Sequence, residues 1–176
     1  MLPFPPIERW RLPEVACELT LNAVMPAGRR GCESGVLWLG QRDALSVITA
    51  VVHPIGEGVE ETSCFWSISP EAYAAVSAWA RPRRLTLLAV AHIHLGAGRA
   101  RMSETDRKQG LKVTDALSII VPRGGLESDP SAWGWFVFDE GDYRELEELE
   151  QVRRIELTST GEVEFARIDT GTQEPA

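Results

Sequence analysis

The sequence has few cysteines and no long apolar segment. Its three cysteines, Cys17, Cys32 and Cys64, are widely spaced and form no Cys-x-x-Cys pair, so a disulfide framework or a cysteine-based zinc site is not indicated. We expect three reduced and mostly buried thiols. No apolar run approaches the roughly 18 residues of a membrane span, and the N-terminus lacks the basic start and apolar stretch of a secretory signal. A cytoplasmic protein without membrane contact is expected.

The chain also lacks an excess of positive charge. Its formal net charge is −8, and residues 123–176 carry 14 acidic and 5 basic side chains. Because affinity for duplex nucleic acid comes from neutralising phosphates, we expect no nucleic-acid partner. The acidic side chains are densest at residues 139–150. Such a run is usually a solvated helix face, and the alternative is a docking surface for a basic partner.

Length and composition indicate one domain. A chain of 176 residues can bury a core without disulfides, but it is too short for an eight-stranded α/β barrel, which needs roughly 250 residues. Prolines near the start predict an extended N-terminal arm over residues 1–11. Residues 12–168 are predicted to form the single domain, and residues 169–176 a flexible tail.

Apolar patterns and turn residues predict alternating strands and helices. Strands are expected at residues 34–39, 44–52, 85–94, 116–121 and 133–138, and a hairpin at residues 154–158 and 162–168. Helices are expected at 14–24, 70–80, 103–109 and 144–152, with a turn at 26–31 and a loop at 56–63. Ser69 and Pro70 are typical of a helix N-cap followed by the first helical position. This order of elements predicts an α/β fold with a central mixed sheet flanked by helices.

Two of the three histidines lie at the end of the predicted buried strand at residues 85–94. His92 and His94 are two residues apart, so a strand places both on one face, close enough to share a metal ion. Asp106, in the first turn of the next helix, can supply a third ligand. Two histidines and a carboxylate with one open position are the ligands of a catalytic zinc site.

Each of these residues also has a structural interpretation. The histidine pair could be part of the core, and Ser103 with Asp106 fits a helix N-cap with an acidic first turn, which is compatible with catalysis. His53, which precedes Pro54 at a predicted strand end, is interpreted as structural.

In type, order and spacing, the motif resembles that of the JAMM (MPN+, JAB1/MPN/Mov34) metalloproteases, in their bacterial single-domain form. The family motif is an upstream glutamate, then His-x-His, then Ser-x-x-Asp. Here His92-Ile-His94 is followed by Ser103-Glu-Thr-Asp106, and Glu33 lies in a loop that leads into an apolar strand ending in glycine. The resemblance covers about residues 12–140.

The sequence departs from the family pattern at two positions. Leu95 and Met102 stand where the family often has prolines, which alters loop stiffness and removes no functional group. The resemblance implies a JAB/MPN domain over residues 12–168, with layers like those of cytidine deaminases.

The resemblance also implies the chemistry of the site. One Zn²⁺ per chain would be bound by His92, His94 and Asp106. Glu33 would act as the general base, and Ser103 would donate a hydrogen bond to the oxyanion. The matched residues favour the active form of the domain over a non-catalytic MPN scaffold, which remains an alternative.

The implied activity is that of an isopeptidase or peptidase that cleaves after the C-terminal glycine of a ubiquitin-like modifier. Expected partners are the modifier or its conjugates, together with activating and conjugating enzymes of the same operon, including operons of antiphage defence. Arg99 and Arg101 place positive charge near the site, which suits an extended modifier tail or is simply solvated. A hydrolase of sulfur-carrier or cysteine metabolism is the second alternative.

Overall fold

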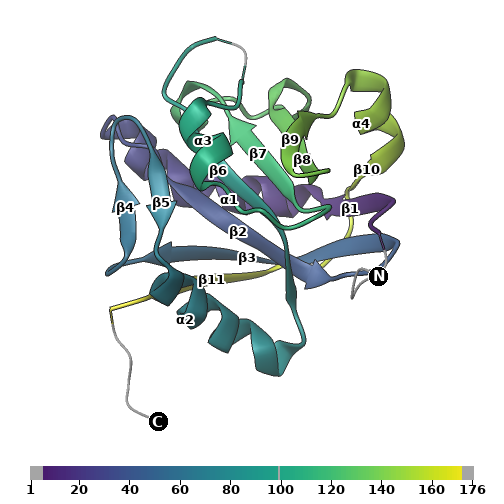
Figure 1. The fold of residues 1–176 in the computed structure, drawn as a ribbon, viewed down its shortest axis with the longest axis horizontal. Helices are drawn as coiled ribbons and strands as arrows, with labels where there is room; N and C mark the ends of the chain where they lie inside the picture. The colour runs from purple at the N-terminus through teal and green to yellow at the C-terminus, as the bar shows by residue number, and fades with distance from the viewer. Residues whose placement is uncertain (1–5, 99, 172–176) are drawn as a thin grey trace.

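The computed structural model describes residues 6–98 and 100–171, which form a curled mixed sheet flanked by helices (Figure 1). The expected α/β fold with a central mixed sheet is confirmed. The strands are β1 Arg9–Pro13, β2 Gly35–Gln41, β3 Leu45–Ile55, β4 Val59–Glu61, β5 Trp66–Ile68, β6 Thr86–Ile93, β7 Leu117–Val121, β8 Gly134–Asp139, β9 Asp142–Glu145, β10 Ile155–Thr158 and β11 Glu164–Asp169. The helices are α1 Glu14–Arg29, α2 Pro70–Ala80, α3 Glu104–Gln109 and α4 Glu148–Arg154.

The main sheet has the order β10-β1-β3-β2-β6-β7-β8-β9, and β11 also pairs with β3. The strands β2 and β6 at its centre are antiparallel, whereas β6 and β7 are parallel. A separate hairpin of β4 and β5 lies on the opposite side of the molecule from α4 (Figure 1). None of the helices in the described residues is long and apolar enough to cross a membrane.

Both faces of the sheet are covered, which explains the continuous apolar run of β2. Val36 and Trp38 belong to the core on the α1 face, and Leu37 and Leu39 to the core on the α2 face. Since alternate side chains of a strand point to opposite faces, a strand buried on both faces must be apolar throughout.

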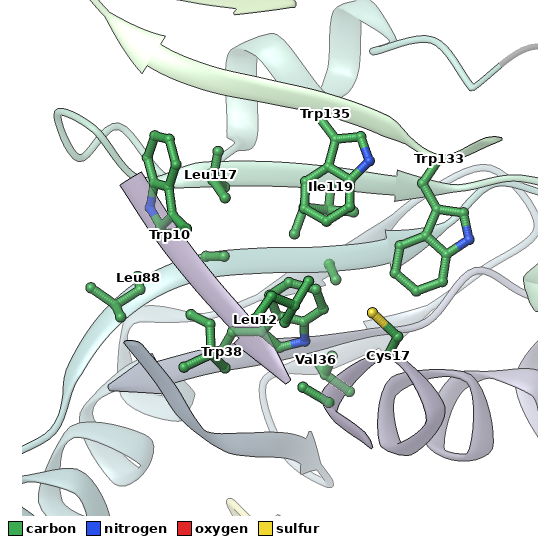
Figure 2. Close-up of a cluster of buried hydrophobic side chains, with 14 of the residues drawn as sticks. Trp10, Leu12, Cys17, Val36, Trp38, Leu88, Leu117, Ile119, Trp133 and Trp135 are labelled. Carbon is green, nitrogen blue, oxygen red and sulfur yellow. The ribbon is translucent and has the colours of Figure 1, made fainter. Parts of the chain in front are cut away.

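The core on the α1 face is rich in tryptophan. Figure 2 shows Trp10, Trp38, Trp133 and Trp135 among aliphatic side chains of the sheet, with Cys17 of α1 beside them. The buried indole of Trp38 donates a hydrogen bond to Thr20 Oγ1 at 2.8 Å, and the Thr20 hydroxyl donates to the Ala16 carbonyl at 2.8 Å. This chain of hydrogen bonds satisfies two polar groups inside the core and joins α1 to the centre of the sheet.

The cysteines differ from expectation in their exposure. Only Cys17 is buried; Cys32 is half-buried and Cys64 is exposed. Burial, with Glu14 and Glu18 nearby, raises the pKa of the Cys17 thiol to about 12. Cys17 therefore behaves as a small apolar side chain.

The hairpin expected at residues 154–168 is wrong. Its two strands do not pair with each other: β10 runs parallel to β1, and β11 runs parallel to β3. β1 ends at Pro13, where α1 begins, so β1 pairs with β3 only at Leu45–Val47. The edge of β3 from Ala50 onward would otherwise stay unpaired, and β11 fills it.

The expected arm and tail differ in part from the structure. Trp10 and Leu12 of β1 are buried, so the sheet begins within the segment expected to be an arm; residues 1–5 lie outside the described part. At the other end, Asp169 closes β11, and residues 172–176 are likewise outside the described part.

Three local expectations are also corrected. Helix α1 continues through Pro26 to Arg29 instead of turning at 26–31; its last turn packs so closely on the turn at Arg123–Gly125 that a Cβ at Gly28 would lie 2.0 Å from the Gly124 carbonyl oxygen. The expected loop at 56–63 contains β4, which pairs with β5. The helix expected at 144–152 begins only at Glu148, because residues 142–145 pair with β8 as β9.

The Thr20 hydrogen bond gives a stability prediction. Thr20→Val keeps the shape of the side chain but leaves the Trp38 indole N–H without an acceptor, so it should lower the free energy of unfolding by about 1–3 kcal/mol. Thr49→Val is the matched control, because Thr49 Oγ1 is buried with no hydrogen-bond partner among residues 6–98 and 100–171, and its loss should be neutral or stabilising. Urea denaturation measures both. Equal effects of the two substitutions would show that the Trp38–Thr20 bond contributes nothing.

Candidate metal centre

His92 lies in the middle of the sheet, near the end of β6. Its backbone is in register with Gly35 of β2 and Ile120 of β7, and its side chain is 7% exposed. His94 follows the strand. Its N–H donates to the Val121 carbonyl at 2.9 Å, and its own carbonyl accepts from the Gly124 N–H at 2.8 Å. Both histidines are therefore held by backbone hydrogen bonds of the sheet and its adjoining turn.

Asp106 is fixed by the start of α3. The Ser103 hydroxyl oxygen accepts from the Asp106 N–H at 3.1 Å, and the Asp106 carboxylate accepts from the Ser103 N–H at 2.7 Å. These two bonds form a capping box. The helix N-cap predicted at Ser103 is confirmed, and it orients the carboxylate toward the histidines.

The two imidazoles and the carboxylate meet at one point. His92 Nε2 lies 3.1 Å from His94 Nε2 and 3.1 Å from Asp106 Oδ1, and His94 Nε2 lies 3.2 Å from Asp106 Oδ2. Tetrahedral zinc with ligands at about 2.0–2.1 Å would separate its ligand atoms by about 3.3 Å. The nitrogen and oxygen atoms of this cluster therefore fit a common metal ion in type and in spacing.

The cluster strongly affects the charge of its members. Burial alone would raise the pKa of Asp106, but the contacts with His92 and His94 outweigh it and hold the pKa below its usual range. Burial lowers the pKa of His94, and the neighbouring Asp106 reverses the shift so that the pKa is raised. Asp106 is thus an ionised carboxylate, the form that binds metal.

Glu33 lies in the loop before β2 and is 7% exposed. Its N–H donates to the Thr62 carbonyl at 2.6 Å, which ties the loop to the β4–β5 hairpin. Its side chain lines a pocket of about 360 Å³ together with His94, Arg101 and the loop after His94. Burial raises the pKa of the Glu33 carboxyl, whereas His94 and His92 lower it and Asp106 raises it, with a net increase.

Trp66 is a site residue that the sequence analysis missed. Its ring stacks on His92 with centroids 6.4 Å apart and an angle of 20° between planes. A Cβ at Gly35 would lie 2.6 Å from the same ring, so only glycine at this position lets the indole reach His92. No sequence signal pointed to Trp66, because β5 is short and its pairing with β4 was not predicted.

A second pocket is lined by two members of the cluster and does not include Glu33. It has a volume of about 390 Å³ and includes His92 and Asp106 in its wall, together with Trp66, Tyr73 and Tyr143. His94 therefore lines a pocket with glycines, and His92 and Asp106 line a pocket with aromatic side chains.

His53 does not join the cluster, but it contacts the residue next to Glu33. Its Nε2 lies 3.4 Å from Ser34 Oγ and 4.0 Å from Glu61 Oε1. Burial lowers the pKa of His53, Glu61 raises it and Arg167 lowers it, with a net decrease. The structural interpretation of His53 stays a prediction.

The interpretation of the acidic residues 139–150 as a solvated face or a docking surface also stays a prediction. Within this segment, Glu150 forms ion pairs with Arg144 and Arg154. Arg99 lies outside the described residues.

Comparisons with known proteins show a shared fold. No family model matches the sequence, and no curated protein matches it. Among solved structures, the chain is similar to the protein DSY2949 from Desulfitobacterium hafniense, with a TM-score of 0.62 and 17% identity over 86% of this chain and 94% of that chain. It is also similar to AF2198, a JAB1/MPN domain protein from Archaeoglobus fulgidus, with a TM-score of 0.45 and 14% identity over 85% and 95% of the two chains. At these identities the likeness to DSY2949 concerns the fold alone.

The fold and the site together define a class of protein. The chain is a mixed α/β protein with a cluster of two histidines and one aspartate that could hold a metal ion. The histidines lie at the end of the central strand β6; His92 and Asp106 line one pocket, and His94 lines another.

Metal analysis tests the cluster directly. We expect about one zinc ion per purified chain, and His92→Ala combined with His94→Ala should remove it, because one carboxylate cannot hold the ion alone. His53→Ala is the matched control and should keep the ion, since His53 lies outside the cluster. A double variant that retains a full equivalent of zinc would show that the ligands are wrong.

His53 gives a pH prediction. Its pKa is lowered from 6.5 in the folded chain, so the unfolded chain takes up a proton first as the pH falls. The contribution of His53 to the free energy of unfolding is therefore fully present above pH 6.5. It is lost as the pH falls through the lower pKa that His53 has in the folded chain. Free energies of unfolding of the wild type and His53→Gln, measured from about pH 8 to about pH 5, should converge at the acidic end. A constant difference would contradict the prediction.

Proposed function

We propose that the chain is a zinc-dependent hydrolase of the JAMM type, with an MPN domain, that cleaves an isopeptide or peptide bond after the C-terminal glycine of a ubiquitin-like modifier. One observation carries the proposal. Glu33, the histidine pair and the Ser103–Asp106 segment are separate in the sequence. In the fold, Glu33 lines a pocket with His94, and Asp106, which is capped by Ser103, clusters with both histidines. These are the elements of the JAMM motif in its order.

His92, His94 and Asp106 are the residues that would hold the metal. A bound zinc ion supplies a Lewis acid and lowers the pKa of a water ligand to about 7. The chain's own contribution is to fix the three donors, one of which, His94, lines a pocket together with Glu33.

Glu33 is the general base in this proposal. It is buried next to the histidines, and burial gives it a raised pKa, which makes its carboxylate a better proton acceptor. It takes a proton from the attacking water and passes that proton to the leaving amine nitrogen. The Thr62 carbonyl holds the backbone of Glu33 through a 2.6 Å hydrogen bond, which fixes the point from which the carboxylate extends.

Ser103 can serve two purposes. Its hydroxyl oxygen accepts the Asp106 N–H, and in the proposed reaction the same hydroxyl turns to donate to the substrate oxygen that becomes negative. A positioned donor of this kind contributes roughly 3 kcal/mol in other acyl-transfer sites.

The walls of the pocket beside Glu33 favour a thin, extended substrate. The pocket beside Glu33 is lined by Gly96, Gly98 and Ala100, which leave room for a backbone with small side chains. Arg101 lies in the same wall and can pair with a carbonyl or carboxylate of the substrate. A glycine-ended tail of a ubiquitin-like protein has this form, and its activating and conjugating enzymes would then be functional partners.

Substitution of Glu33 separates chemistry from metal binding. Glu33→Gln leaves all three ligands in place, so zinc content and thermal stability should stay nearly unchanged, while turnover on a glycine-linked isopeptide substrate should fall by about 10²- to 10⁴-fold. Glu60→Gln, at an exposed position of β4, is the control and should keep full activity. Equal turnover of the wild type and Glu33→Gln would contradict the role of Glu33 as general base and favour a binding scaffold.

Ser103 has a matched control in the other capped helix. Ser103→Ala and Ser69→Ala each remove an N-cap and should each cost about 1 kcal/mol of stability. Only Ser103→Ala should also lower turnover, by about 10²- to 10³-fold. If both variants lose stability and neither loses turnover, Ser103 is a helix cap alone.

A wild type that cleaves a sulfur-carrier tail and no other modifier fusion would move the substrate to the alternative class.

A further inference from the structure

A cleft of about 670 Å³ lies on the α1 face, between α1, β3, β4 and β11. Its wall contains none of the four residues Glu33, His92, His94 and Asp106. It is the largest of the described pockets, and neither the motif nor the proposed reaction uses it.

The cleft has apolar walls on both sides. Leu19 and Ala23 of α1 form one wall, and Val59 of β4 and Phe165 of β11 contribute to the other. Phe165, the second residue of β11, is 42% exposed. An apolar group bound in the cleft would cover this ring and remove it from water.

The polar part of the cleft carries excess positive charge. Arg167 lies directly beside His53 across the β11–β3 pairing, and it makes no ion pair within residues 6–98 and 100–171. Arg30 is already paired with Glu61 at 2.9 Å, so those two charges balance. Burial lowers the pKa of His53, which keeps its ring neutral near pH 7. Of the described residues that line the cleft, Arg167 is therefore the uncompensated arginine, in a chain whose net charge is −8.

We propose that this cleft binds a small organic anion, with a carboxylate on Arg167 and an apolar body between α1 and Phe165. Among the described residues that line the cleft, Arg167 is the cation without an ion pair, and it selects one negative charge. The apolar walls select against a bare inorganic anion, which would leave them unfilled. The proposal is independent of the metal chemistry, because the cleft and the cluster share no residue.

A titration of the full chain with 3-phenylpropionate, followed by backbone amide shifts in NMR, tests the site. Saturable shifts are expected at Ala23, Val59 and Phe165. The uncharged 3-phenylpropanamide should bind about fivefold more weakly, because it loses the pairing with Arg167. Inorganic phosphate alone should give no saturable shifts at these positions.

Two variants locate the binding energy. Arg167→Gln should weaken 3-phenylpropionate by about fivefold and leave 3-phenylpropanamide unchanged. Arg153→Gln removes the same charge at an exposed position of α4 and should leave both ligands unchanged. Phe165→Ser should weaken both ligands alike. The proposal is overturned if the acid and the amide bind equally, if Arg167→Gln binds as the wild type does, if the saturable shifts fall at His92, His94 and Asp106, or if no saturation occurs.

Discussion

The pairing of β2 with β6 is the constraint on which the candidate site depends. Gly35 is in register with His92, and the Ser34 carbonyl accepts the Ile93 N–H at 2.9 Å just beyond it. This register places Glu33 beside the end of β6, where His94 leaves the strand. A slip by one residue would turn His92 to the opposite face and move Glu33 away from it. The register is secured by the apolar side chains of β2, which are buried on both faces of the sheet.

The remaining parts of the site are fastened to this pair of strands by short local structures. The capping box of α3 fixes the Asp106 carboxylate, and the β4–β5 hairpin contributes both the Thr62 carbonyl for Glu33 and the Trp66 ring for His92. The hairpin thus touches the candidate base and a candidate ligand at once. Residues held by strands and caps keep their positions more accurately than residues on free loops, which suits a site that must present three donors together.

The sequence allowed much of this arrangement to be predicted because its signals were local. The apolar run before His92 predicted β6, and Ser69 and Ser103 predicted two helix starts that the structure confirms. The prediction that β10 pairs with β11 was wrong. A glycine between two short strands suggests a hairpin, but β11 pairs instead with the part of the β3 edge that β1 leaves free. Trp66 could not be found for a similar reason, since its contact with His92 depends on the absence of a side chain at Gly35.

The glycines around the site differ in what they do. Gly28 and Gly35 are required by packing, because a Cβ at either would collide with backbone or with the Trp66 ring. Gly96 and Gly98 have open space around them, with no atom within 4 Å of a built Cβ, and neither has a positive φ. Nothing in the described part of the fold demands glycine at these two positions. Both line the pocket of Glu33 and His94, and their lack of side chains keeps that pocket open. Under the proposed function, the loop after His94 is therefore where the shape of the substrate would be selected.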